Sequence, residues 1–456
     1  MKVLSRRAKV MLVFSLVVVS GLLFFTARYI NRAPAWAQYP TNRHFFKDGR
    51  LILSGTIYDR TGKPLLQTEE GTIKFNSNQL VRTAMMHATG DLYGNVVTGA
   101  QVVFGERLTG WDFLNGAYHF NKQAGNNLTL TLDAGLCAEA YSALNGRKGT
   151  VGVYNYQTGE LLCMVSSPSF DPQNPPDVAK NPEKYEGVYI NRLLSASYTP
   201  GSVFKLVTAS AAIDLLKDID QTVYHCDGAL DIGGDKVTCP EAHGDVTLEK
   251  ALAKSCNVAF AEITLKLGKE NLQNYADKAG LNASLDVDGM KTAKGVVKLT
   301  DAQGANLAWA GIGQYSDMVN PLNFMAFVGA IANDGVRVSP SIVLEKGAFS
   351  GMAYSVGGSK RILSAGTAKT LGEMMRNNVV SEYGESNYSG LELCAKTGTA
   401  EVGKDKRPHS WFVGYMDRED FPLAFVVVVE NGGSGGKVAG PVAARVLRAA
   451  VKNAVK

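Results

Sequence analysis

The chain has 456 residues, of which 45% are hydrophobic and 20% are charged, and its formal net charge is +5. This length is enough for two or three domains and at least one large core, and the composition is that of an ordinary globular protein. The basic residues form no long run outside the N-terminus, which argues against nucleic-acid binding.

A basic segment followed by an apolar run opens the chain. The basic residues are Lys2, Arg6, Arg7 and Lys9. Residues 10–27 carry no charge, and as a helix they span about 27 Å, close to the ~30 Å hydrocarbon core of a bilayer. We therefore predict a cytoplasmic tail over 1–9, one transmembrane anchor over 10–30 and a body outside the cytoplasm. A signal peptide cleaved between Ala37 and Gln38 is the alternative, but that site lies well beyond the apolar run.

The segment after the anchor predicts a small module. The sequence from Tyr29 to Phe46 is typical of an irregular juxtamembrane linker. Residues 51–130 are rich in Gly, Thr, Asn and aromatics, with short alternating stretches such as "GTIYDRTGKPLL". This pattern predicts a β-rich module with hairpins, which we place at residues 31–130.

The remaining residues, 131–456, predict one larger domain. Helical apolar spacing over 133–144 precedes two strand-like runs around a Gln-Thr-Gly turn, and helical patterns dominate from 202 to about 333. Three strand-like runs, "LCAKTGTAE", "HSWFVGYMD" and "PLAFVVVVEN", then precede a final helical pattern. This order predicts an α/β (α+β) fold, with a central antiparallel sheet and helices on both of its faces.

The six cysteines leave several interpretations open. Cys163 and Cys394 lie in strand-like runs and are predicted to be buried small hydrophobic residues. Cys226 and Cys239 flank a Gly-rich turn, and in an exported protein they could form a disulfide. With His243, and with Cys256 as a further ligand, they could instead bind zinc, although the spacing fits no common finger pattern. Free thiols are the third possibility, so the sequence assigns no metal and no cofactor.

A serine and a lysine stand three residues apart in "YTPGSVFKLVTAS". Pro200 and Gly201 should end the preceding element and place Ser202 in the first turn of a helix, on the same face as Lys205. A serine hydroxyl needs a base to act as a nucleophile, and a neutral lysine amine can serve. The spacing alone is weak, because Ser434 and Lys437 repeat it.

Two further motifs strengthen the interpretation. "KSCNVAF" contains Ser255 and Asn257, suited to relay a proton and to hold an amide. "CAKTGTAE" supplies four adjacent candidates on a predicted strand: Lys396, Thr397, Gly398 and Thr399. We predict that Lys396 and the threonines bind a substrate carboxylate, and that Gly398 lets a peptide lie against the strand edge. Each motif is weak singly, but the three in this order are typical of penicillin-binding proteins and β-lactamases.

On these motifs the chain resembles the class B penicillin-binding proteins, membrane-anchored peptidoglycan D,D-transpeptidases. Segments such as "GTIYDRTGKPLL", "NRLLSASYTPGSVFK", "VTLEKALAKSCNVAF" and "HSWFVGY" extend the resemblance over nearly the whole chain beyond the anchor. The resemblance implies that residues 31–130 form a non-catalytic pedestal and 131–456 a transpeptidase domain. It implies as partners D-Ala-D-Ala stem peptides, β-lactam inhibitors and a membrane glycan polymerase of the division, elongation or sporulation machinery.

The resemblance also implies roles for individual residues. Ser202 would be the acylated nucleophile, Lys205 its base and Ser255 the proton relay. The residues that grip the peptide would be Asn257, Lys396, Thr397 and Thr399. The backbone amides of Ser202 and Thr399 would form the oxyanion hole.

The chain departs from the family pattern in three places. Ser54 stands where the family usually has arginine, and Tyr315 and Asn320 stand where glycine and threonine are common. The pedestal is also short. These departures do not affect the predicted catalytic residues. They leave open which protein assembly the pedestal binds.

Other classes fit less well. "NGGSGGK" matches a hydrolase nucleophile elbow at Ser434, but no histidine follows it in the sequence, so we predict a Gly-rich turn before the last helix. A β-lactamase would need a second base, for which the sequence shows no motif. A D,D-carboxypeptidase differs only in its acceptor and remains the main alternative. A non-enzymatic β-lactam receptor or scaffold is the other, and a receptor would need a cytoplasmic effector.

Overall fold

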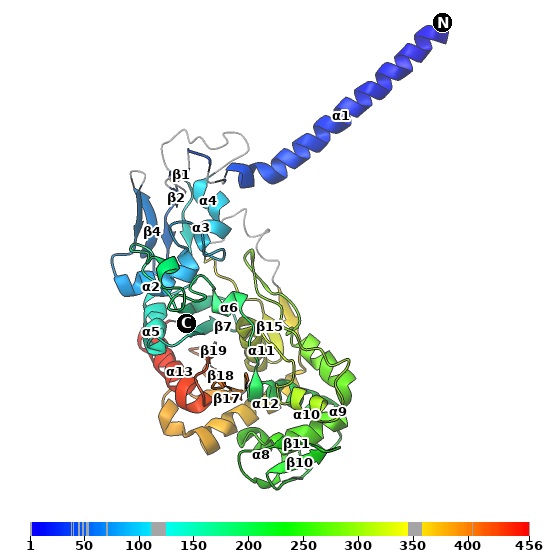
Figure 1. Ribbon diagram of the computed structural model, residues 1–456, viewed down its shortest axis with the longest axis vertical. Coiled ribbons are helices and arrows are strands. Elements are labelled where there is room, and N and C mark those ends of the chain that lie inside the picture. The colour runs from blue at the N-terminus through cyan, green and yellow to red at the C-terminus, as the bar shows by residue number, and fades with distance from the viewer. Residues whose placement is uncertain are drawn as a thin grey trace.

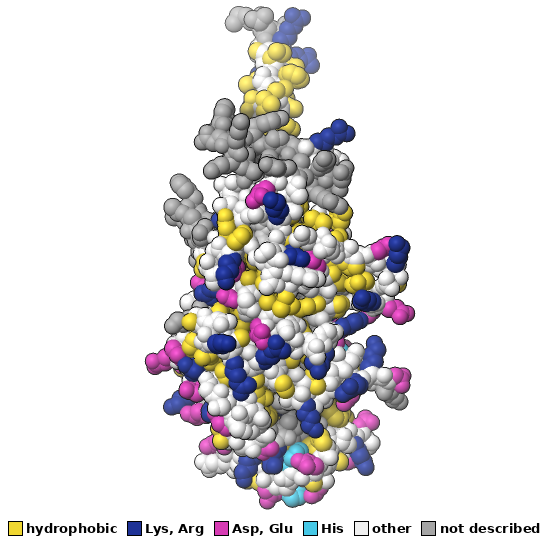
Figure 2. Space-filling model, turned by 90° about the vertical axis from the view of Figure 1, so that its left-hand side faces the viewer, with side chains coloured by type: hydrophobic (Ala, Val, Ile, Leu, Met, Phe, Trp, Pro, Cys, Tyr) yellow, Lys and Arg dark blue, Asp and Glu magenta, His cyan; other side chains and the backbone are white. Residues whose placement is uncertain are grey.

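The first helix extends away from the rest of the protein in the computed structural model (Figure 1). The model describes residues 2–455 except 38, 40, 44–45, 48–49, 52–53, 70–71, 111–124, 345–357 and 404. Helix α1 runs over Lys2–Ala37, and its stretch Ser5–Ala33 is long and apolar enough to cross a membrane. Figure 2 shows hydrophobic side chains on its surface and basic ones at its far end. The linker predicted to be irregular from Tyr29 is helical up to Ala37, because each residue added to an existing helix gains a hydrogen bond.

A four-stranded sheet with three helices follows α1. The sheet has the order β5-β4-β3-β6, with β3 and β6 parallel. Its strands are β3 (Ile57–Tyr58), β4 (Pro64–Glu69), β5 (Thr72–Phe75) and β6 (Leu128–Thr129). The helices are α2 (Gln79–Thr89), α3 (Ala100–Val103) and α4 (Gly105–Thr109), and β1 (Phe46–Lys47) pairs with β2 (Arg50–Leu51). The predicted hairpins are present, but the helices were missed, although the Asn78 side chain caps α2.

The central sheet has five antiparallel strands in the order β17-β18-β19-β7-β8. They are β7 (Gly149–Asn155), β8 (Leu161–Ser167), β17 (Leu393–Ala400), β18 (His409–Met416) and β19 (Leu423–Val429). Strand β19 pairs with β7, so the early hairpin joins the three late strands in one sheet. Strand β17 pairs only with β18 and forms one edge.

Helices cover both faces of this sheet, which confirms the predicted fold class (Figure 1). On one face lie α5 (Ala134–Leu144) and α13 (Gly435–Lys452), against β8 and against β18 and β19. On the other lies α11 (Pro321–Ala332), against β18 and β19. Helix α12 (Ala365–Asn378) and the short helices Val379–Tyr383 and Glu385–Tyr388 flank β17.

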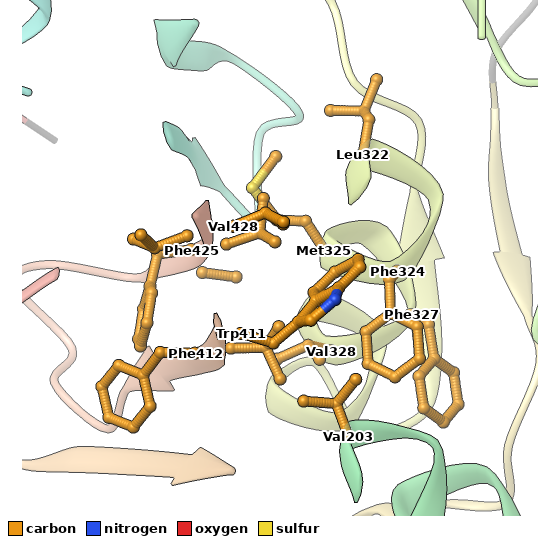
Figure 3. Packing of buried hydrophobic residues seen from close by; sticks show 14 of the residues in the cluster. Val203, Leu322, Phe324, Met325, Phe327, Val328, Trp411, Phe412, Phe425 and Val428 are labelled. Carbon is orange, nitrogen blue, oxygen red and sulfur yellow. The ribbon is translucent and has the colours of Figure 1, made fainter. Parts of the chain in front are cut away.

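Trp411 joins the sheet to α11 and to the segment that carries the predicted nucleophile. Its fully buried ring lies 6.1 Å from that of Phe324 between centroids, and Val203 lies nearby (Figure 3). The indole Nε1 donates a hydrogen bond to the carbonyl of Thr199, at 3.0 Å. A buried indole needs such a partner, so this contact fixes the entry to the 200–205 turn relative to the sheet.

A lobe of helices and short hairpins completes the molecule at the end farthest from α1 (Figure 1). Its helices are α7 (Lys205–Leu215), α8 (Leu248–Ala253), α9 (Asn257–Lys278) and α10 (Gly304–Ala310). Between α7 and α8, β9 (Tyr224–Cys226) pairs with β12 (Gly244–Val246), and β10 (Ala229–Ile232) pairs with β11 (Asp235–Thr238). Smaller elements are α6 (Arg192–Ser195), the 3₁₀ turn Val178–Lys180, and the pairs β13–β14 (Asp286–Val287, Met290–Lys291) and β15–β16 (Val336–Val338, Ser359–Arg361).

Candidate active site

Ser202 lies in a 3₁₀ turn, Gly201–Phe204, that leads directly into α7. The turn lies so close to β17 that a Cβ on Gly201 would be 2.8 Å from the carbonyl oxygen of Thr399. Gly201 also has a φ of +57°, which favours glycine. The Pro-Gly pair thus presses the turn against the edge strand and leaves Ser202 partly exposed, facing a cavity of about 720 Å³.

The Lys205 amine is fully buried beside the second motif. Its Nζ donates to the carbonyl oxygen of Ser255 at 2.6 Å and to Asn257 Oδ1 at 2.8 Å, and lies 3.2 Å from Ser255 Oγ. Burial lowers the pKa of Lys205 to about 7, although nearby Cys256 and Cys239 act in the opposite direction. Near neutral pH a large share of this amine is therefore neutral and able to accept a proton.

The second motif follows α8 and begins α9. Ser255 has a φ of +55°, an uncommon conformation for a residue with a side chain, and this turns its carbonyl toward Lys205. Asn257 is the first residue of α9, and its Nδ2 donates to the Thr238 carbonyl at 2.7 Å. The motif is therefore fixed by hydrogen bonds to the Lys205 amine on one side and to the last residue of β11 on the other.

Lys396 brings the third motif to the same serine. Its buried Nζ lies 3.2 Å from Ser255 Oγ and donates to the Thr397 carbonyl at 3.0 Å. Burial, and next the charge of Lys205, lower its pKa well below the usual range. The Ser255 hydroxyl thus stands between two amines, both pushed toward their neutral forms.

Thr397 and Thr399 line the cavity together with Ser202, Ser255 and Asn257. The Thr397 amide donates to the Tyr383 hydroxyl at 3.2 Å, and so points away from β18. Since alternate residues of a strand point the same way, the Thr399 amide faces the open edge as well. The structure therefore places five of the predicted residues around one cavity, and the buried amines of Lys205 and Lys396 meet at Ser255, which lines it.

The structure gives a packing reason for glycine at position 398, and its predicted role beside a bound peptide stays a prediction. Gly398 does not line the cavity, and a Cβ built on it would lie 3.0 Å from the Pro200 carbonyl oxygen, Trp411 Cβ and Val203 Cγ1. Such contacts leave almost no room for a side chain. Glycine is needed here for close packing of β17 against the 200–205 turn, on the side of the strand away from the cavity.

Two contributors escaped the sequence analysis. The Tyr383 hydroxyl contacts both the amide and the Oγ1 of Thr397, and burial raises its pKa to about 12. Cys239 Sγ accepts from the amides of Asn257 and Val258, at 3.1 and 3.4 Å. No sequence signal marks Tyr383, and for Cys239 the sequence leaves open a disulfide, a zinc site or a free thiol without predicting contacts to these amides.

The second Ser-x-x-Lys is not part of the site. Ser434 and Lys437 are exposed at the start of α13, and the Ser434 carbonyl accepts from Ser410 Oγ at 3.1 Å. This confirms the predicted Gly-rich turn between the last strand and the last helix. All six cysteines are free in the described part of the chain, and Cys163 and Cys394 are buried as predicted.

The arrangement is that of a serine acyl-transfer enzyme in which an amine takes the place of the usual imidazole base. A model of the penicillin binding protein transpeptidase domain matches residues 149–448. The chain is 30% identical over 394 residues to peptidoglycan D,D-transpeptidase PbpA of Mycolicibacterium smegmatis, covering 77% of this chain and 76% of the relative.

Solved structures agree with this match. The crystal structure of PBPA from Mycobacterium tuberculosis superposes with a TM-score of 0.74 at 25% identity, covering 88% of this chain and 99% of the other. The D,D-transpeptidase domain of a peptidoglycan glycosyltransferase from Eggerthella lenta superposes with a TM-score of 0.71 at 26% identity. The match covers 88% of this chain and 98% of the other. The chain belongs to the penicillin-binding protein transpeptidase family, and its recognition as a class B member is confirmed.

Proposed function

We propose that the chain is a peptidoglycan D,D-transpeptidase that cross-links stem peptides through an acyl-enzyme on Ser202 and is inhibited by β-lactams. One observation carries the proposal: a buried Lys205 amine, with its pKa lowered to about 7, contacts Ser255 and Asn257 beside the cavity that Ser202 lines. A buried, partly neutral amine next to a serine is what acyl transfer without histidine requires.

The first half of the reaction forms an ester and releases D-alanine. Ser202 Oγ attacks the carbonyl carbon of the penultimate D-Ala while its proton moves to Lys205 Nζ. The amides of Ser202 and Thr399 hold the developing oxyanion. The C–N bond to the terminal D-Ala then breaks, and the leaving amine takes its proton through Ser255 Oγ, which lies 3.2 Å from each lysine.

The second half transfers the acyl group to an amine. The acceptor amine of a neighbouring stem peptide attacks the ester carbonyl carbon, a C–N bond forms and the acyl C–O bond to Ser202 breaks. The proton of the amine passes by way of Lys205 to the released Ser202 oxygen. The donor peptide is held as an added strand along the open edge of β17. The Thr397 and Thr399 hydroxyls bind the terminal carboxylate of the donor, and Asn257 holds its amide. Lys396 is buried behind them and acts through its hydrogen bond with Ser255.

The test separates cross-linking from hydrolysis. Glycan strands bearing un-cross-linked pentapeptide stems are incubated with the membrane-reconstituted protein, digested and separated as muropeptides. We expect cross-linked dimers, with one D-alanine released per cross-link, because the proposed acceptor is an amine. Ser202→Ala should give neither product. D-alanine release with tetrapeptide monomers and no dimers would make the protein a D,D-carboxypeptidase.

We also propose the division into a pedestal over 31–130 and a catalytic domain over 131–456. Helix α5 begins just after the boundary, at Ala134, and packs against β8 and α13 as well as against α2 of the pedestal. The two parts are joined by a bidentate ion pair between Arg82 of α2 and Asp171, with distances of 2.7 and 2.8 Å. The guanidinium holds the pKa of the Asp171 carboxyl below its usual range. The pedestal therefore supports the catalytic domain rigidly rather than through a loose linker.

For the membrane, we propose that the N-terminus is cytoplasmic and the body extracytoplasmic. Support comes from the basic residues ahead of the apolar stretch of α1. Protease added to intact spheroplasts is expected to digest the body. A fully protected body, in cells whose outer proteins are digested, would reverse the orientation.

The exposed apolar surface of α1 is also the proposed contact with a membrane glycan polymerase, which would supply the strands. Co-purification from solubilised membranes would identify that partner. A replacement of α1 by an unrelated transmembrane helix that left co-purification unchanged would rule out this contact.

A further inference from the structure

Three cysteines and a histidine meet beside the active site. Cys226 Sγ lies 3.7 Å from Cys239 Sγ and 3.4 Å from His243 Nδ1, and Cys239 Sγ lies 3.9 Å from Cys256 Sγ. All four candidate ligand atoms lie within 4.8 Å of one another. They come from the end of β9, the segments after β11 and before β12, and the N-cap of α9.

These distances fit a tetrahedral zinc site. Zn–S bonds of about 2.3 Å and a Zn–N bond of about 2.0–2.1 Å imply edges of about 3.8 Å between sulfurs and about 3.6 Å between sulfur and nitrogen. Three of the six separations between ligand atoms, 3.4–3.9 Å, match those edges, and the other three lie within 4.8 Å. Three thiols and one imidazole, without a carboxylate, select zinc over magnesium or calcium.

Four protein ligands are typical of a structural zinc site, although Cys239 and His243 also line the active-site cavity. Cys226 and Cys256 are buried, and Cys239 and His243 are half-buried. The sulfurs also accept amide hydrogen bonds from the start of α9: Asn257 and Val258 donate to Cys239, and Ala259 donates to Cys256 at 3.4 Å. Amides directed at sulfur stabilise metal-bound thiolates. The hairpins between α7 and α8 have short strands, and in small units of this kind a metal can replace part of a hydrophobic core.

We propose that Cys226, Cys239, His243 and Cys256 bind one Zn²⁺ ion and that this site positions Asn257 in the active site. Binding displaces the protons of the three thiols, and the neutral imidazole supplies the fourth ligand. Cys256 is the middle residue of the Ser255–Asn257 motif. Asn257 further donates its backbone amide to Cys239 and its side chain to Thr238, the residue before Cys239. The metal site stands independently of the proposed reaction, whereas the positioning role rests on it.

The first test measures metal in the full-length, detergent-purified protein. We expect about one zinc per chain, released when the thiols are titrated with a mercurial. Cobalt exchanged for zinc should show the absorption bands of tetrahedral thiolate coordination. A metal-free protein with six titratable thiols would overturn the proposal, and so would a disulfide between Cys226 and Cys239 mapped by mass spectrometry.

Matched variants test the ligands. His243→Ala should lose the zinc, whereas His243→Cys should retain it with four sulfur ligands. His225→Ala is the control, because His225 is exposed on the same β9 strand and its imidazole nitrogens contact Asp227 and Asp245. Loss of zinc in His225→Ala together with retention in His243→Ala would contradict the ligand assignment.

The positioning role has its own readout. We expect His243→Ala to slow covalent penicillin labelling about 10- to 100-fold, as is typical when the support of a site is lost. His243→Cys should restore the rate. Unchanged labelling in a zinc-free His243→Ala protein would refute positioning while leaving the zinc site. Zinc binding in a protein that penicillin never labels would instead point to failure of the proposed function.

Discussion

Replacing Lys205 with alanine is expected to slow covalent labelling by fluorescent penicillin by about 10²- to 10⁴-fold or more. A positioned base contributes about this much, and Lys205 is the buried amine next to Ser202 in the 3₁₀ turn and α7. Ser202→Ala should remove the label altogether, because Ser202 is the assigned nucleophile and the other hydroxyl beside this base, Ser255 Oγ, is assigned to the proton relay. The measurement is the labelling rate at several penicillin concentrations.

The chain provides its own control for this experiment. Ser434 and Lys437 have the same spacing but are exposed. Ser434→Ala and Lys437→Ala should label at the rate of the unaltered protein. Label retained by Ser202→Ala, or mapped to Ser434, would contradict the assignment of the nucleophile.

The second large effect is the pH dependence of acylation. The pKa of Lys205 is lowered to about 7 by burial, so below that pH its amine is mostly protonated and cannot accept the Ser202 proton. The rate should therefore rise about tenfold per pH unit up to pH ~7 and level off above it. Between pH 5 and the plateau the increase is about 100-fold.

The profile is measured as the second-order rate of penicillin labelling from pH 5 to 9, with circular dichroism to verify that the fold is intact at each pH. Lys437→Ala should give the same inflection, since Lys437 is exposed and does not line the cavity. A rate that stays level between pH 5.5 and 8.5 would show that Lys205 is not the base.

Much of the fold and most of the site could be predicted from the sequence. The three late strands have long runs of buried residues, and their patterns are unambiguous over seven or eight positions. The motifs carry their chemistry in residue types at short spacings, so Ser202–Lys205 and Ser255–Asn257 were found without the fold.

Other features depend on contacts between distant segments. Strands such as β9 or β13 have two or three residues, which is too few for an alternating apolar pattern to be recognised in the sequence. Tyr383 reaches Thr397 only because a short helix lies along β17. The need for glycine at 398 likewise comes from Pro200 and Trp411, far away in the sequence. The cysteine and histidine cluster required four segments to be placed together before its geometry could be judged.

The order of strands in the central sheet also bears on how the chain folds. Gly149 of β7 pairs with Val429 of β19, so the sheet closes only when residues from both ends of the matched domain are present. Loop closure over such a distance is slow, and until then one edge of the β7–β8 hairpin has no partner. A nascent chain stopped before Leu423 would contain every residue of the three motifs, yet β7 would lack β19 and the sheet would lack its middle strand. Folding of this domain therefore depends on residues from Leu423 onward, and until they are present the unpaired β7–β8 hairpin is the segment most in need of protection from aggregation.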